Sequence, residues 1–437
     1  MQTVENFEKQ LWKYALPSMF TQLLNSLFII IDGYFVGQNM GDAGLAAINV
    51  AWPLVALVQA VSLAIGIGGA VRMSINMGRG DKEAADKERI HALIMLAMAT
   101  LIMGIGLYLC YPYALPHLGA NQELYPMTAE YIRVVCICAS CQVFTTGLLP
   151  LLRGDGRTMT AMWLTVMGIL GNVVLDWFCI QHLNLGMKGA ALATAVSQAM
   201  CGIPAFILFI KGREKTVRFR FEPKRMLGIL RNGISAFGLS ISDSILILMG
   251  NLQAMRYGGT EGVAVYAVLS YVLGSVIPLV SGVGNGIQPL LSKAYGAGDR
   301  KAVEKLRRKG AAVAVSASVV CSVAVWMLKT QLPLIFGASP DAAAQVSNAI
   351  WTLVLAFPFM AVVRFMCSYF CALGQPAESS VLAYGEPLGV QPLFLFTLPL
   401  FLGLKGVWVS YPSAMIVMSV IAISLMRVSG RKMSQNI

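Results

Sequence analysis

Charged and histidine side chains are scarce in this sequence. Only 12% of its 437 residues are Asp, Glu, Lys or Arg, whereas soluble proteins usually contain about 25%. The three histidines, His91, His117 and His182, do not have the spacing of a metal-binding motif. The sequence also has no phosphate-binding loop and no nucleophile elbow. These absences argue against a soluble protein, a membrane enzyme, or a pump driven by ATP hydrolysis within this chain.

Long apolar stretches dominate the sequence instead. Hydrophobic residues make up 57% of the chain, and the mean hydropathy is +0.68. Stretches of roughly 20 residues, enough to cross the hydrocarbon core of a bilayer, recur about twelve times between short polar turns. The sequence therefore predicts an all-α membrane protein. Its first apolar segment follows charged residues, including Glu5, Glu8 and Lys13, and we expect this segment to stay uncleaved.

The nine cysteines do not predict a disulfide framework. Nearly all of them lie inside apolar stretches, where a free Cys packs as a small hydrophobic residue. Cys136, Cys138 and Cys141 share one stretch, and no His or carboxylate cluster lies beside them in the sequence. We therefore expect them to pack in a helix and not to bind a metal.

Basic residues lie mostly on one side of the predicted spans. All but six of the 33 Lys and Arg residues fall near the chain ends or in loops after the second, fourth, sixth and eighth spans. This positive-inside asymmetry predicts that both termini are cytoplasmic. The net charge of +12 is then a topology signal, and no nucleic-acid partner is expected. We expect a multi-pass protein of the cell membrane.

A polar motif occurs twice, about half the chain apart, at residues 78–82 (GRGDK) and 296–300 (GAGDR). Further residues match at the same spacing, including Gly44/Gly262, Ala46/Ala264, Gly66/Gly284, Gly68/Gly286 and Ser74/Ser292. The chain is therefore predicted to be two copies of one unit, a six-helix bundle over residues 1–215 and another over 216–437. Such duplication is typical of carriers that bind substrate between two bundles and rock one bundle against the other.

Two kinds of charged segment connect the predicted spans. The segments Arg72 to Arg89 and Lys293 to Lys309 are amphipathic, and we expect them to form short interfacial helices. The basic residues 211–225 join the two halves. They are predicted to be a cytoplasmic linker that attracts the head groups of anionic membrane lipids.

Charges inside membrane spans are costly, so each one is a candidate functional residue. The candidates are Asp32, Asp176, Asp243, Arg364 and Glu386. Asn172 precedes Asp176 by four residues, which places both side chains on one helix face. A carboxyl group in a low-dielectric environment near a second one can exchange a proton near neutral pH, as a proton-coupled carrier requires. The alternative is structural pairing, in which Arg364 neutralises Asp243 or Glu386.

Several motifs together resemble the multidrug and toxic compound extrusion (MATE) family over nearly the whole chain. They are Leu16-Pro17, Ile31-Asp32-Gly33, residues 44–47 (GLAA), the paired Gly-x-Gly-Asp loops, residues 171–176 (GNVVLD) and Gln288-Pro289. The resemblance is to small Gram-positive-type multidrug efflux pumps near the proton-driven DinF-like branch. It implies a MATE/MOP-type fold of 12 transmembrane helices in two pseudo-symmetric six-helix bundles.

The resemblance also assigns roles to particular residues. The proton site of that branch corresponds to Asp32 in the first span, Tyr131 in the fourth, Asn172 and Asp176 in the fifth and Thr194 in the sixth. Pro17 resembles the proline at which the first span bends, and Asp243 lies where the sodium-coupled branch carries an acidic residue. In span ten, where the proton-driven branch has another carboxylate, this chain has Val362 with Arg364 nearby.

The resemblance implies a secondary antiporter that exports amphiphilic, often cationic drugs in exchange for protons. Sodium is the alternative coupling ion. The ion gradient supplies the energy, and no cofactor is expected. We expect a monomer. A lipid-linked oligosaccharide flippase of the same superfamily is the alternative, but such proteins usually have extra spans and a more cationic cleft. A sugar carrier of the major facilitator class fits the Asn172/Asp176 pair less well.

Overall fold

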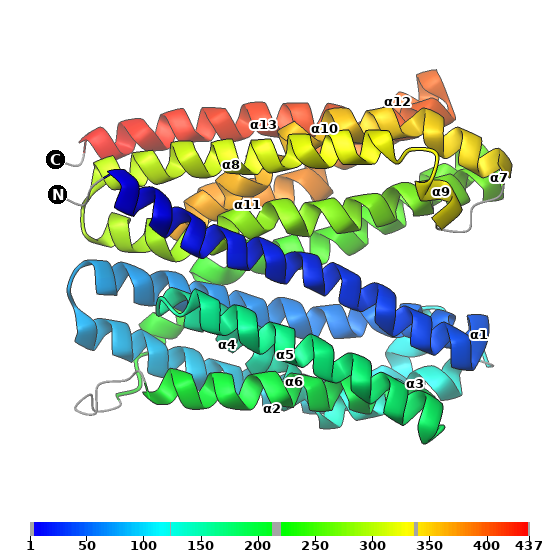
Figure 1. The fold of residues 1–437 in the computed structure, drawn as a ribbon, viewed down its shortest axis with the longest axis horizontal. Helices are drawn as coiled ribbons and strands as arrows, with labels where there is room; N and C mark the ends of the chain where they lie inside the picture. Colours follow the sequence, from blue (N-terminus) through cyan, green and yellow to red (C-terminus); the bar gives the residue numbers. More distant parts are fainter. Residues whose placement is uncertain (1–3, 123, 212–219, 336–339, 436–437) are drawn as a thin grey trace. The chain divides into compact units, whose positions relative to one another are not determined.

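The computed structural model describes residues 4–122, 124–211, 220–335 and 340–435. Every regular element in these residues is a helix (Figure 1). The helices are α1 (Val4–Gly78), α2 (Lys82–His117), α3 (Leu124–Ile137), α4 (Ala139–Gly154), α5 (Thr158–Asp176), η1 (Trp177–His182), α6 (Gly186–Lys211), α7 (Pro223–Gly296), α8 (Arg300–Met327), α9 (Leu332–Ile335), α10 (Pro340–Ala372), α11 (Pro376–Gly385), η2 (Glu386–Val390), α12 (Gln391–Leu402) and α13 (Leu404–Gln435).

The predicted membrane spans are confirmed. Among the described residues, 11 helices are long and apolar enough to cross a membrane, and there are 12 if α3 and α4, bent by 61°, count as one span. Helices α1 and α7 contain two spans each. They break at Gly41 (φ 61, ψ −156) and Gly259 (φ 59, ψ −153), which have the same spacing as the repeated motif. The two halves of the chain therefore repeat in backbone conformation as well as in sequence.

The chain forms two compact units. The N-terminal unit contains Phe20–Ser240 and Ser292–Asp299, and the C-terminal unit contains Met1–Met19, Ile241–Leu291 and Arg300–Ile437. The chain therefore changes unit once inside α1, twice inside α7 and again between α7 and α8. The predicted boundary between residues 215 and 216 lies outside the described residues and stays a prediction.

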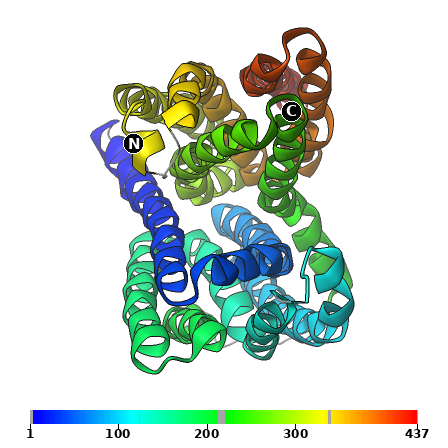
Figure 2. The same cartoon turned by 90° about the vertical axis from the view of Figure 1, so that its right-hand side faces the viewer.

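Helix packing inside each unit follows the apolar faces. In the N-terminal unit, α6 packs against α4 and α5, and α2 packs against α3 and α4 (Figure 2). In the C-terminal unit, α10 packs against α8 and α13. Large apolar side chains also face outward. On α2, Leu101 and Ile102 are each 64% exposed, as expected for a helix surface that lipid covers.

The repeated motif forms a tight turn between two long helices. Gly80 and Gly298 both have positive φ, 80° and 71°, a conformation that only glycine adopts without steric cost. Asp81 then caps α2, because its carboxylate accepts a hydrogen bond from the Ala84 N–H at 2.8 Å. The expected short interfacial helices over residues 72–89 and 293–309 are wrong. These residues are the ends and beginnings of the long helices, since the turn is too tight to leave a separate segment.

Candidate functional site

Two aspartates meet in the N-terminal unit. Asp176 is the last residue of α5 and has no exposed surface, and Asp32 lies half-buried in the first span of α1. Their carboxyl groups are in side-chain hydrogen-bonding contact. The Oδ1 atom of each is buried and has no hydrogen-bond partner among the described residues. Two neighbouring carboxyl groups repel each other when both are ionised, so their proximity favours a proton on one of them.

Asn172 fixes the orientation of Asp176. The Asn172 side chain is oriented with its amide nitrogen towards Asp176. The nitrogen donates to Oδ2 of Asp176 at 2.8 Å, and the amide oxygen accepts from the backbone N–H of Thr194 at 3.3 Å. The spacing of four residues thus brings both side chains to one face, as predicted. Thr194 of α6 takes part through its backbone in this arrangement, and no described contact links its hydroxyl to either aspartate.

Tyr131 of α3 completes the cluster. Its side chain is buried, and its phenol lies within electrostatic range of both Asp32 and Asp176. The structure therefore brings together all five residues that the resemblance placed at a proton site, and it does so from α1, α3, α5 and α6. We refer to Asp32, Tyr131, Asn172, Asp176 and Thr194 as the carboxyl cluster.

Pro17 does not belong to this cluster. It is buried in α1 and falls in the C-terminal unit, whereas Asp32 falls in the N-terminal unit. The two residues are fifteen positions apart, which is about 22 Å along a helix axis. Its role as a hinge stays a prediction.

The polar residues predicted in the second half form a different arrangement. Arg364 of α10 and Glu386, the first residue of η2, form an ion pair of 3.6 Å, with their side chains only 3% and 2% exposed. Of the two partners expected for Arg364, the structure shows Glu386. The side chain of Asp243 lies outside the described part of the structure. This buried ion pair joins groups of opposite sign, whereas Asp32 and Asp176 of the N-terminal unit are two acidic groups.

Cysteine and metal chemistry do not define a site in the described residues. None of the nine cysteines, all of which lie in the described ranges, forms a disulfide. No group of three or more His, Cys, Asp or Glu side chains in the described ranges is arranged to hold a metal ion.

Sequence reasoning missed a buried carboxylate near the start of α2. Glu88 has a fully buried side chain that forms ion pairs with Arg72 and Arg225. Its only signal in the sequence was its place in a charged segment next to a membrane span, which also fits an exposed residue.

A duplicated, all-helical chain with carboxyl groups buried among its spans is an integral membrane protein of the transporter type. The MatE family model matches residues 17–178 and 236–384. This is well over half of the chain, and the chain therefore belongs to the MatE family.

Curated relatives carry the name multidrug export protein MepA. The protein of that name from Staphylococcus haemolyticus is 23% identical over 416 residues, which cover 91% of this chain and 88% of the relative. One from Staphylococcus aureus is 24% identical over 411 residues, covering 91% and 89%.

Solved structures share the fold. MATE in its straight conformation matches with a TM-score of 0.93 at 24% identity, covering 98% of this chain and 97% of that one. The outward-facing conformation of a multidrug resistance MATE family transporter of the MOP superfamily matches with the same score, identity and coverage. The predicted MATE/MOP-type fold is confirmed.

Proposed function

We propose that this protein is a secondary antiporter that exports amphiphilic, often cationic compounds from the cytoplasm in exchange for protons. The observation that carries the proposal is the contact between the Asp32 and Asp176 carboxyl groups inside the N-terminal unit. Relatives named as multidrug export proteins support the substrate class. The excess of basic residues in one set of loops supports an orientation with both termini in the cytoplasm.

The geometry of the carboxyl cluster supports proton exchange. Asn172 holds Oδ2 of Asp176, so that Oδ1 stays available to bind a proton. When the pair is deprotonated, its negative charge attracts a cation. When a proton neutralises it, this attraction is lost. Proton binding and cation binding then compete, and competition for one site is a simple way to couple two opposite fluxes.

The energy available is sufficient for export. One proton moving down a potential of 100 mV supplies about 2.3 kcal/mol. At perfect coupling this sustains roughly a 50-fold gradient of a neutral substrate, since a tenfold ratio corresponds to about 1.4 kcal/mol.

The test is ethidium efflux by the purified protein in liposomes, driven by an imposed proton gradient or, separately, by a sodium gradient. Asp32→Asn and Asp176→Asn remove the ionisable groups and should abolish proton-driven efflux. Glu130→Gln is the matched control, because Glu130 is a carboxylate of the same unit that pairs with Lys188 at 2.9 Å and is 36% exposed. If Asp32→Asn transports as fast as the wild type, the assignment of the proton site to the carboxyl cluster is wrong. Efflux driven by sodium alone would contradict proton coupling.

A further inference from the structure

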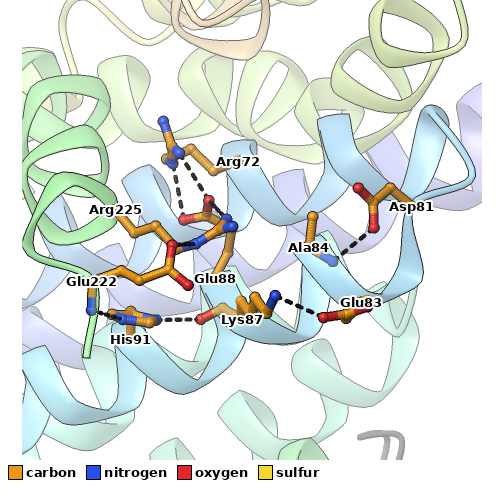
Figure 3. A network of polar contacts seen from close by, with 9 residues as sticks. All are labelled: Arg72, Asp81, Glu83, Ala84, Lys87, Glu88, His91, Glu222 and Arg225. Atoms are coloured by element: carbon orange, nitrogen blue, oxygen red, sulfur yellow. Dashed lines mark hydrogen bonds and ion pairs between the residues drawn. The ribbon is translucent and has the colours of Figure 1, made fainter. Parts of the chain in front are cut away.

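A single buried carboxylate joins three helices of the N-terminal unit. Glu88, near the start of α2, accepts hydrogen bonds from Arg72 Nε at 2.9 Å and from Arg72 Nη2 at 2.8 Å (Figure 3). Its Oε1 also accepts from Arg225 Nη1 at 2.8 Å. Arg72 lies near the end of α1, and Arg225 lies in the first turn of α7. Glu88 itself has no exposed side-chain surface.

A second contact holds the same turn of α7. His91 lies one turn after Glu88, and its Nε2 accepts from the backbone N–H of Glu222 at 3.0 Å. Its Nδ1 then carries the proton and donates to the Lys87 carbonyl at 2.7 Å. The Glu222 carboxylate in turn accepts from Arg225 Nε at 2.7 Å. The start of α7 is thus attached to α2 at two neighbouring points, both visible in Figure 3.

Glycines allow α7 to lie directly against α1. A Cβ atom on Gly68 of α1 would overlap the Ile229 carbonyl of α7, and a Cβ on Gly233 of α7 would overlap the Ala64 carbonyl of α1. The two backbones therefore touch, as small residues permit in membrane helices. The backbone contact and the ion pairs of Glu88 therefore both attach the same segment, residues 223–240, to α1 and α2.

The ion pairs are not repeated in the second half of the chain. The spacing that pairs Gly80 with Gly298 pairs Glu88 with Leu306 and Arg72 with Leu290. The charged attachment therefore belongs to the start of α7 alone and is not a requirement of the repeated fold.

We propose that Glu88 is a latch residue that holds the start of α7, residues 223–240, on the N-terminal unit and whose release accompanies the opening of this end of the protein to the cytoplasm. Helix α7 makes the coupling direct, since residues 223–240 belong to the N-terminal unit and Ile241–Leu291 to the C-terminal unit. Alternating access requires one bundle to move relative to the other. Because α7 belongs to both units, it must then move relative to one of them. The inference rests on the transport function proposed above.

Amide hydrogen exchange of the purified protein tests the latch. Glu88→Gln removes the charge that two arginines share, and exchange across residues 223–240 should become at least about tenfold faster, because local opening is no longer opposed by the buried ion pairs. Exchange in α5 and α6 should not change. Glu83→Gln is the control, because Glu83 lies on the same helix and pairs with Lys87 at 2.6 Å.

Arg225→Gln is a second variant in case Glu88→Gln does not fold, since it leaves the Glu88–Arg72 pair intact. The same local effect is expected. Unchanged exchange, or faster exchange throughout the N-terminal unit, would overturn the latch.

Ethidium efflux by the same variants tests the role in transport. A weakened latch shifts the balance between the two states, and we expect maximal efflux to fall by at least about threefold in Glu88→Gln but not in Glu83→Gln. Unchanged efflux despite faster exchange would overturn the role in transport. The exchange measurement does not need an active transporter. A wild-type protein that fails to transport therefore contradicts the proposed function, whereas a transporting protein whose variants exchange normally contradicts only the latch.

Discussion

At the scale of single residues, the carboxyl cluster depends on how one side chain orients another. Asp32 and Asp176 were identifiable as charges inside apolar spans and Asn172 by its spacing from Asp176, whereas Tyr131 and Thr194 were expected only from the resemblance to the family. The sequence did not reveal that Thr194 contributes its backbone N–H, because any residue at that position offers the same group. Nor did it reveal the buried state of Glu88, whose partners Arg72 and Arg225 lie 16 and 137 residues away along the chain.

Replacement of Asn172 tests the orientation of Asp176. Asn172→Ala removes a hydrogen bond of 2.8 Å to Oδ2 of Asp176, and the carboxyl group is then free to rotate. We expect proton-driven efflux to fall by about tenfold, equivalent to roughly 1.4 kcal/mol. Asn39→Ala is the control, because Asn39 is exposed and donates only to the Phe35 carbonyl of its own helix. Equal efflux by the two variants would contradict this role of Asn172.

Glu222 gives a prediction about pH. The hydrogen bond from Arg225 holds the pKa of Glu222 below its ordinary value. Its folded-state pKa is thus lower than its unfolded-state pKa, and its stabilising effect is complete above about pH 4.3 and disappears as the pH falls through the lower value. The difference in Tm between wild type and Glu222→Gln should therefore be constant from about pH 8 to about pH 5. A difference that vanishes within that range would contradict the pairing.

At the scale of helices, the length of the apolar stretches predicted the spans. It did not predict where the helices bend or which helices pack together. The 61° bend between α3 and α4 lies at Cys138, with no proline or glycine beside it. The division of α1 and α7 between the two units depends on close backbone contacts that hydropathy does not report. These contacts come from individual glycines, whose role is visible only when the neighbouring helix is known.

Substitution of a contact glycine tests the packing of α1 against α7. Gly68→Ala places a methyl group on the Ile229 carbonyl, which is backbone and cannot move aside easily. We expect a loss of about 1–3 kcal/mol in stability, the usual cost of overpacking, measured as a lower Tm. Gly106→Ala is the control, because a Cβ on Gly106 of α2 meets nothing within 4 Å. No difference between the two variants would argue against direct backbone contact.

At the scale of the whole molecule, the two halves share a fold, but the charged groups singled out inside their spans differ. The N-terminal unit contains two carboxyl groups in contact, and the C-terminal unit contains the Arg364–Glu386 ion pair. The sequence predicted the repeat, the spans and the residues of the carboxyl cluster. It left the partner of Arg364 open, because two acidic residues in the same half were both possible.

The contrast between the units yields a prediction about coupling. Glu386→Gln removes the 3.6 Å ion pair with Arg364, and breaking a buried ion pair typically costs about 3–5 kcal/mol. We expect a lower Tm but an unchanged dependence of efflux on the proton gradient, because we assign coupling to the N-terminal unit. Loss of that dependence in a variant that is still folded would place a coupling residue in the C-terminal unit.

The most direct test of antiport is to follow protons while the drug moves. Liposomes that contain the protein and ethidium, with no initial pH gradient, should acidify inside as ethidium leaves, as recorded by an enclosed pH-sensitive dye. The Asp32→Asn protein should show no such acidification. Ethidium efflux through the wild-type protein without any change in internal pH would contradict the proposed exchange of drug for protons.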